Sequence, residues 1–324
     1  MKAMVYKKYG SPDVLHIEEV EKPTAREDEV LVRVHAASLN AADWHLLTAD
    51  IFLVRLFSGL LKPGRTILGT DIAGRVEAVG GNVRQFKPGD EVFGDLFAHG
   101  GGGFAEFVSA PESALVLKPA NLSFEEAAAV PLAARTALHG LRDHGRIQPR
   151  QKVLIQGASG GVGTFAVQMA RSFGAEITAV CSTMNQEQAR SLGADHVIDY
   201  SSADFTRSGH QYDLILAVNG YHPITAYRRA LAFGGTYAMI GGKPAQLFQC
   251  LLFGPFLSLY GNKKMRVVSS KSSREDLLFL KELIETGGLF PVIDRRYPLS
   301  ETAEALRYLG QGHARGKVVI TVAA

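Results

Sequence analysis

A glycine-rich turn between an apolar run and an alanine-rich run constrains this chain most. Residues 153–156 are apolar-rich, as in a buried parallel strand, and Gly157, Gly160 and Gly163 follow with the spacing G-x-x-G-x-x-G. Beyond the turn, apolar residues continue at helical spacing to residue 171. Such glycines let backbone amides approach a pyrophosphate at a helix N-terminus. We therefore predict a nucleotide-binding unit, rather than a merely tight turn, with Gly157, Gly160 and Gly163 beside the ligand.

Length and composition limit the class of protein. The 324 residues suggest about two domains, and 46 % hydrophobic with 21 % charged residues is a globular composition. A net charge of +3 without a basic stripe argues against a nucleic-acid partner. The longest apolar stretches, residues 51–61 and 247–260, are too short to span a membrane. No secretory signal precedes the first strand pattern, so we expect a cytoplasmic protein.

Two kinds of pattern divide the chain. Up to about residue 120, short strands alternate with turns, which predicts a β-rich domain. A capping box at residues 123–126 then begins a helix, and strands alternate with helices from Val153 onward, as in a doubly wound parallel sheet. The predicted strands of that sheet are residues 153–156, 176–181, 196–199, 213–217, 236–240 and 265–269. We predict an α/β fold with one domain at 1–122 and 288–324 and another at 123–287.

The end of the second predicted strand bears on the choice of cofactor. A site that prefers NAD needs a carboxylate about 20 residues after the glycine turn, to hold the ribose 2′-hydroxyl. Residues 181–185 offer hydroxyl and amide groups instead, and the first acid is Glu187 in the next predicted helix. Donors without a carboxylate favour a 2′-phosphate and hence NADP(H). Ser182 and Thr183 could also serve to cap that helix.

Motifs along the whole chain resemble the medium-chain dehydrogenase/reductase superfamily, and within it the zinc-free quinone oxidoreductase and alkenal (enone) reductase branch. The resemblance implies a GroES-like β-barrel formed by both chain ends, an inserted Rossmann domain and an active cleft between them. It also implies a nicotinamide cofactor. The motifs that carry the resemblance are residues 32–40, 69–74, 86–92, 157–163, 192–200 and 316–319.

The positions that hold zinc in other members are changed here. Zinc enzymes of the superfamily have a cysteine where this chain has Asn40, and Gly-His-Glu where it has residues 69–71. With only two cysteines, the chain also lacks the four-cysteine structural zinc lobe. We predict no metal site. Without zinc, alcohol oxidation loses its Lewis acid, whereas conjugate reduction of a quinone or an enone does not need one.

The resemblance implies roles for individual residues. Asn40 is the expected hydrogen-bond donor at the substrate carbonyl. His45, to which the resemblance assigns no role, is either a proton donor or a solvated histidine on a short helix. Met184 stands where close relatives often carry an arginine beside the 2′-phosphate. The other expected cofactor contacts are Thr136 with the turn residues Ser159, Gly160, Gly161, Val162 and Gly163 at the nicotinamide ribose and the phosphates, Ser182, Thr183 and Tyr200 around the 2′-phosphate, Asn219, Gly241 and Gly242 at strand ends, and Lys317 near the phosphates.

The leading interpretation is an NADPH-dependent reductase of quinones or α,β-unsaturated carbonyls. The alternatives are an NADPH-binding sensor or partner-binding protein with little turnover, and an alcohol dehydrogenase with improvised metal ligation. Residues 51–61 and 247–260 are interpreted either as core helices or as an apolar lip over a lipophilic substrate. The last strand of the sheet should have an unpaired edge, through which two copies would form a homodimer, with residues 247–260 covering the joint.

Overall fold

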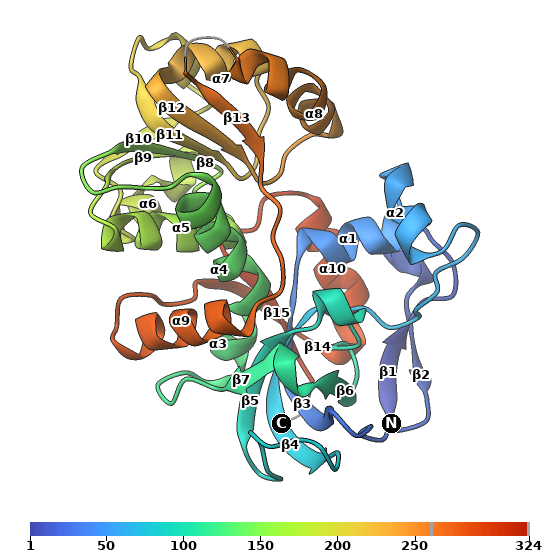
Figure 1. The fold of residues 1–324 in the computed structure, drawn as a ribbon. Helices are drawn as coiled ribbons and strands as arrows, with labels where there is room; N and C mark the ends of the chain where they lie inside the picture. The colour runs from blue at the N-terminus through green and yellow to red at the C-terminus, as the bar shows by residue number, and fades with distance from the viewer. Residues whose placement is uncertain (260–261, 323–324) are drawn as a thin grey trace. The chain divides into compact units, whose positions relative to one another are not determined.

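The computed structural model describes residues 1–259 and 262–322, which form two compact units (Figure 1). The first unit comprises Met1–Ala133, Lys271–Gly287 and Pro291–Ala324. The second comprises Ala134–Ser270 and Gly288–Phe290. The predicted α/β class, with a β-rich part and a parallel-sheet part, is confirmed.

The first unit is built around one long strand, β3 (Glu29–Leu39). It pairs antiparallel with β4 and β15 and also with β6, in a sheet of order β14-β15-β3-β4-β5-β7. Valines at alternate positions, Val30, Val32 and Val34, are fully buried in the core of this unit. The other strands are β1 (Lys2–Val5), β2 (His16–Glu19), β4 (Asp71–Val79), β5 (Glu91–Asp95), β6 (Phe107–Pro111), β7 (Leu115–Leu117), β14 (Ile293–Pro298) and β15 (Lys317–Thr321).

Helices accompany this sheet, and two of them lie in a different unit from the one predicted. Helices α3 (Phe124–Ala128) and α9 (Arg274–Glu285) belong to the first unit, although residues 123–287 were predicted to form the other domain. Glu125 of α3 accepts hydrogen bonds from Arg296 and Thr321, and the carbonyl of Ile284 in α9 accepts one from Asn121. The remaining helices are α1 (Ala41–Thr48), α2 (Phe52–Ser58), α4 (Pro131–Leu138), which continues into the second unit, and α10 (Thr302–Gly310).

The second unit contains a six-stranded sheet of order β10-β9-β8-β11-β12-β13, in which every pairing is parallel. The predicted doubly wound sheet is thereby confirmed. Its strands are β8 (Lys152–Gln156), β9 (Glu176–Cys181), β10 (His196–Asp199), β11 (Tyr212–Ala217), β12 (Leu231–Met239) and β13 (Lys264–Val267). Its helices are α5 (Gly161–Ser172), α6 (Gln186–Ser191), α7 (Ile224–Ala230) and α8 (Pro244–Ser258).

The two apolar stretches lie at the surface of their units rather than in a core. In α2 and the residues after it, Phe57 is 84 % and Leu61 89 % exposed. In and just after α8, Phe256 is 67 % and Leu259 77 % exposed. Among the described residues, no helix has the length and apolar content to cross a bilayer. The interpretation of these stretches as ordinary core helices is therefore not supported.

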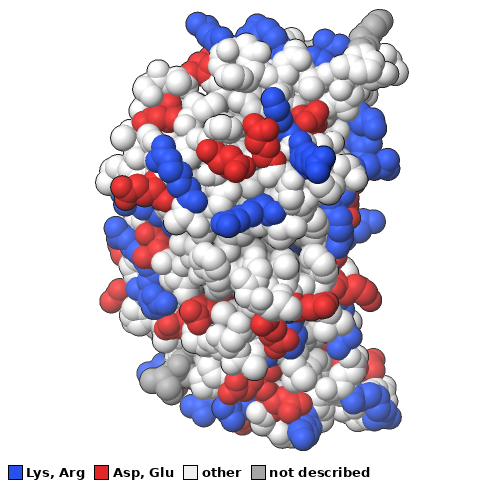
Figure 2. All heavy atoms as spheres, turned by 90° about the vertical axis from the view of Figure 1, so that its left-hand side faces the viewer, with Lys and Arg blue, Asp and Glu red and all other residues white. Residues whose placement is uncertain are grey.

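Charges on the surface are mixed. On the face drawn in Figure 2, Lys and Arg side chains lie among Asp and Glu side chains instead of gathering into one basic field. This distribution agrees with the small net charge of +3. It gives no support for a nucleic-acid partner on that face.

Candidate active site

The predicted cofactor contacts of the second unit lie at one edge of its sheet. The glycine turn follows β8, Ser182 and Thr183 follow β9, and Tyr200 follows β10. Asn219 and the pair Gly241–Gly242 come after β11 and β12. Because all these strands run parallel, their carboxyl ends share the edge at which ligands bind in such sheets. Thr136 lies in the part of α4 that belongs to this unit.

The glycine turn has the shape that a pyrophosphate requires. Gly157 has a φ of +81°, which favours glycine, and a Cβ on Gly163 would lie 2.1 Å from the carbonyl oxygen of Gly157, so α5 packs directly on the turn. A Cβ on Gly160, in contrast, would meet no atom nearer than 3.8 Å. The space outside Gly160 is therefore open, next to the first amides of α5, which have no acceptor within the helix. These residues fit a dinucleotide phosphate.

A carboxylate that the sequence analysis did not find lies beside the expected 2′-phosphate site. Asp199, the last residue of β10, accepts hydrogen bonds from the Thr183 hydroxyl and from the amide and hydroxyl of Ser201. These hydrogen bonds hold the pKa of Asp199 below its ordinary value. The register of the sheet explains the proximity, because Asp199 pairs with Cys181 at the end of β9. An ionised carboxylate is thus next to one of the proposed phosphate donors.

The rest of the 182–185 segment is arranged around Asn185. Its Nδ2 donates to Ser159 Oγ at 3.0 Å and to Ser182 Oγ at 3.1 Å, which ties the segment to the glycine turn. Met184 is 73 % exposed, so this position has room for a longer side chain. Arg190, the next arginine along the chain after Met184, donates from Nη2 to Gln186 Oε1 at 3.3 Å.

The first unit contains a buried polar cluster centred on Asp71. The Lys317 ammonium lies 3.5 Å from Asp71 Oδ2, 2.6 Å from Asn40 Oδ1 and 3.0 Å from the carbonyl oxygen of Leu39. The side chain of Lys317 is 3 % exposed and that of Asp71 is fully buried. Burial lowers the pKa of Lys317 and raises that of Asp71, while their mutual attraction opposes both shifts. Lys317 is thus the counter-ion of Asp71, and its contact with a cofactor phosphate stays a prediction.

Asn40 takes part in this cluster through both ends of its amide. Nδ2 donates to Asp71 Oδ2 at 2.9 Å and to Thr70 Oγ1 at 3.1 Å, while Oδ1 accepts from Lys317. The Lys317 ammonium can only donate, which fixes the orientation of the amide. The backbone amide of Asn40 donates to Asp43, whose pKa burial raises to about 7. Asn40 is 8 % exposed, so its hydrogen bonds are made mainly within the protein.

His45, the candidate proton donor, lies on α1 of the same unit. Its Nδ1 is 2.8 Å from Asp50 Oδ1, and both side chains are about 40 % exposed, 39 % for the histidine and 41 % for the aspartate. No hydrogen bond links His45 to the Asn40 cluster among the contacts of the described residues. The part of the chain that the structure describes contains no group of three or more His, Cys, Asp or Glu side chains able to hold a metal ion.

Comparison with known proteins agrees with this architecture. A family model described as an alcohol dehydrogenase GroES-like domain matches residues 26–120, and one described as a zinc-binding dehydrogenase matches residues 192–320. A chloroplastic quinone oxidoreductase of Triphysaria versicolor is 35 % identical, over 99 % of this chain and 98 % of its own length. An NADPH-dependent alkenal/one oxidoreductase of Arabidopsis thaliana is 33 % identical, over 99 % and 79 %. The solved quinone oxidoreductase of Coxiella burnetii matches with a TM-score of 0.87 at 28 % identity, over 100 % and 99 %.

A β-rich unit that includes both the first and the last strand, together with a doubly wound sheet and its glycine turn, defines a two-domain nucleotide-dependent oxidoreductase. The chain belongs to the medium-chain dehydrogenase/reductase family, in the branch of quinone oxidoreductases and alkenal reductases. Its β-rich unit is the GroES-like domain and its parallel sheet is the Rossmann domain. Asn40 and Thr70, which the resemblance places at the zinc-ligand positions of other members, both join the Asp71 cluster through their side chains.

Proposed function

We propose that this protein reduces a quinone or an α,β-unsaturated carbonyl compound with NADPH, without a metal ion. One observation carries the proposal: the glycine turn fits a dinucleotide, while the residues at the zinc-ligand positions are hydrogen-bonded into a buried Lys–Asp cluster. A bound reduced nicotinamide would supply hydride. Hydride addition to an enone or a quinone needs donors for the developing oxyanion, not a Lewis acid. The names of the relatives support the same substrate classes.

In this proposal the chain binds and orients the reactants. The amides at the start of α5 hold the pyrophosphate, and Asn219 with Gly241–Gly242 borders the cofactor at the strand ends. Asn40 donates to the substrate oxygen. Its bond to the neutral Thr70 hydroxyl is weaker than its bond to the Asp71 carboxylate, so the Thr70 bond is the one exchanged for the substrate. Lys317 keeps the amide turned for donation throughout. The exposed His45 or water then supplies the proton.

The proposed preference for NADPH over NADH depends on the hydrogen-bond donors of residues 182–185. The Asp199 carboxylate weakens this preference. The Thr183 proton is directed at Asp199, and the carboxylate would repel a 2′-phosphate. We expect wild-type protein to bind NADPH several-fold more tightly than NADH in calorimetric titrations. Met184→Arg should strengthen NADPH binding alone, because a guanidinium pairs with phosphate in bidentate fashion. Equal affinities of the wild-type protein for NADPH and NADH would contradict the assignment.

Asp199→Asn tests whether the Asp199 carboxylate weakens the preference for NADPH over NADH. The amide can keep the hydrogen bond with Thr183 while the charge is removed, so the ratio of NADPH to NADH affinity should rise by about tenfold. Glu176→Gln is the matched control, since it removes an equal charge at the opposite end of the neighbouring strand β9. A similar rise in the control would mean that net charge, rather than the position of Asp199, decides the preference.

Steady-state oxidation of NADPH with a panel of quinones and alkenals tests the proposed activity. Turnover of one class and not the other assigns the substrate. NADPH binding without turnover of any acceptor would instead support the sensor or partner-binding alternative. Activity that is lost to a chelator and restored by zinc would support the alcohol dehydrogenase alternative.

We also propose that the protein is a homodimer that pairs through β13.

A further inference from the structure

Helix α8 exposes a row of apolar side chains to solvent. Phe248, Leu251, Leu252 and Phe256 recur at spacings of three and four residues, so they form one stripe along the helix, and each is more than half exposed. Leu259 continues this stripe one turn beyond Phe256, and Pro255 also lies on it. A surface helix of a water-soluble domain ordinarily carries charged and polar residues on this side. We call Phe248, Leu251, Leu252, Pro255, Phe256 and Leu259 the α8 stripe.

Hydrogen bonds from two glutamines hold α8 in place. Gln246 is buried, and its Nε2 donates to the hydroxyls of Tyr227 and Tyr237 at 3.2 Å and 2.5 Å. Gln249 Oε1 accepts from the backbone amide of Ile224 at 3.1 Å. These bonds anchor the helix in one rotational setting, so the α8 stripe cannot turn inward without breaking them. The outward apolar face is therefore a fixed feature of the unit.

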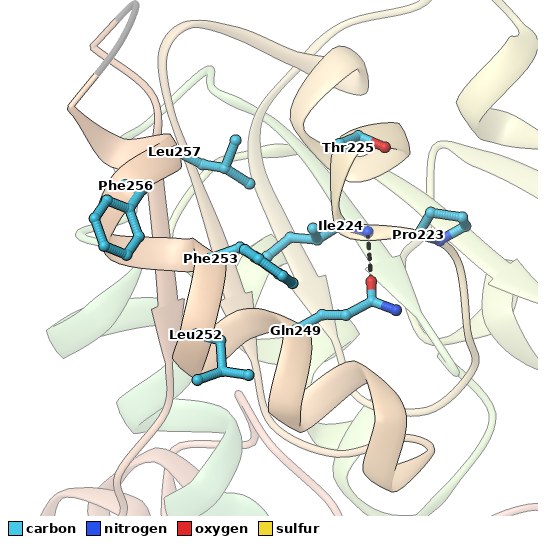
Figure 3. A pocket seen from close by; sticks show the side chains of 8 residues that line it. All are labelled: Pro223, Ile224, Thr225, Gln249, Leu252, Phe253, Phe256 and Leu257. Atoms are coloured by element: carbon cyan, nitrogen blue, oxygen red, sulfur yellow. Dashed lines mark hydrogen bonds between the residues drawn. The ribbon is translucent and has the colours of Figure 1, made fainter.

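An apolar groove between α7 and α8 borders the stripe, and Leu252 and Phe256 belong to both (Figure 3). Its volume is about 730 Å³. Figure 3 shows the side chains of Phe253 and Leu257 extending from α8 toward Ile224, with Gln249 bonded to the Ile224 amide at the side. Such a groove can take a hydrocarbon chain, because six of its eight lining residues are apolar.

The charged residues of the segment that contains α8 have one sign. Acidic residues make up about one in ten of the whole chain, yet residues 214–270 contain none. The same segment contains six basic residues, Arg228, Arg229, Lys243, Lys263, Lys264 and Arg266. Lys243 immediately precedes α8, and Lys263 and Lys264 follow shortly after it. An uncharged apolar helix is thus bordered by cations at both ends.

We propose that the α8 stripe docks on the surface of an anionic lipid bilayer, with the helix lying in the plane of the interface. Apolar side chains of an interfacial helix enter the acyl boundary, while flanking Lys and Arg side chains pair with anionic headgroups. A second copy of the chain fits less well. A two-fold interface through the stripe would bring the lysines near the ends of α8, Lys243, Lys263 and Lys264, toward those of the other copy, with no carboxylate from the segment to offset them. The proposed dimer pairs through the β13 edge instead of through the stripe. The inference is independent of the proposed reaction.

Co-sedimentation with vesicles tests this docking. Wild-type protein should bind vesicles of phosphatidylcholine with phosphatidylglycerol, should bind pure phosphatidylcholine vesicles much more weakly, and should be released by high NaCl. Phe256→Glu should weaken binding to the anionic vesicles by about tenfold or more, since it removes an apolar contact and adds a repelled charge. Lys264→Glu, a second variant that leaves the stripe intact, should weaken it as well.

Phe233→Glu is the matched control. Phe233 is a phenylalanine of the same unit, 78 % exposed, but it lies on β12 rather than on α8. It should bind vesicles as the wild type does, and thermal melts should show all variants folded. Absence of wild-type binding, equal loss in Phe233→Glu and Phe256→Glu, or salt-independent binding to neutral vesicles would overturn the proposal. So would a change from dimer to monomer in Phe256→Glu with unchanged vesicle binding, which would identify the stripe as a protein interface.

Discussion

The buried charges of the GroES-like unit make its stability sensitive to single substitutions. Lys317 and Asp71 are both removed from water, and each has its charge compensated mainly by the other and by the amide of Asn40. A buried pair of this kind adds little net stability, because desolvation opposes the attraction, yet loss of one member leaves the other charge uncompensated. The cluster therefore positions Asn40 more than it stabilises the fold.

Lys317→Met should lower the free energy of unfolding by about 3 kcal/mol, because Asp71 would remain buried without its counter-ion. Urea denaturation followed by circular dichroism measures this change. The double variant Lys317→Met with Asp71→Asn should regain part of the loss, because neither position then carries a charge that lacks its partner. Lys7→Met is the control, since its pair with Glu18 is exposed, and it should leave stability nearly unchanged. A loss no larger in Lys317→Met than in this control would contradict the account.

Asn40→Ala should lower kcat more than it weakens cofactor binding, because charge develops on the substrate oxygen only in the transition state. It will also destabilise the unit, so a control is needed that breaks a hydrogen bond to the same carboxylate. Ser38→Ala removes the bond from Ser38 Oγ to Asp71 Oδ2, which is 3.1 Å long. Both variants should lose about 1 kcal/mol of stability, but kcat should fall only in Asn40→Ala. Unchanged turnover in that variant would remove Asn40 from the mechanism.

At the scale of elements, two glycines in the strand–turn–helix of residues 152–172 have different roles, one in packing and one at the expected phosphate site. Gly163 is needed for packing, since a Cβ there would overlap the Gly157 carbonyl, whereas Gly160 faces open space. Gly163→Ala should therefore cost about 1–3 kcal/mol of stability. Gly160→Ala should cost less than about 1 kcal/mol, yet weaken NADPH binding at least about tenfold, as its methyl group would fill the space of the phosphates.

Thermal unfolding and calorimetric titration of the two glycine variants measure these effects separately. If Gly160→Ala bound NADPH as tightly as the wild type, the phosphates would not approach this turn.

Elements with strong local signals were predictable from the sequence, and contacts between distant segments were not. All six strands of the parallel sheet were found, because their apolar runs alternate with helical patterns. Strand β2 gives no such signal, since three of its four residues, His16, Ile17 and Glu19, are exposed and Ile17 is its one apolar residue. The proximity of Asp199 to Thr183 depends on the β9–β10 register, which the parallel sheet order itself could have suggested. The Lys317 cluster joins residues more than 200 positions apart, which no local pattern records.

At the scale of the whole molecule, the free edge of β13 leads to the predicted homodimer. This strand is the last in the sheet order and pairs only with β12 among the described residues. Such an edge tends to pair with another strand unless charges protect it, and Lys264 and Arg266 lie on it. Two edges that meet about a two-fold axis would place these cations near one another, so salt should promote the pairing.

Light scattering at low and high NaCl measures this assembly. We expect a mass near twice the 35.0 kDa of one chain, with a dimer fraction that rises with salt. Replacing Lys264 and Arg266 together with threonine should strengthen the dimer at low salt, because the repulsion is gone and threonine favours strands. Phe233→Glu, away from the β13 edge, should not change the mass. A mass of 35.0 kDa at every salt concentration would show that the two cations protect the edge and keep the chain monomeric.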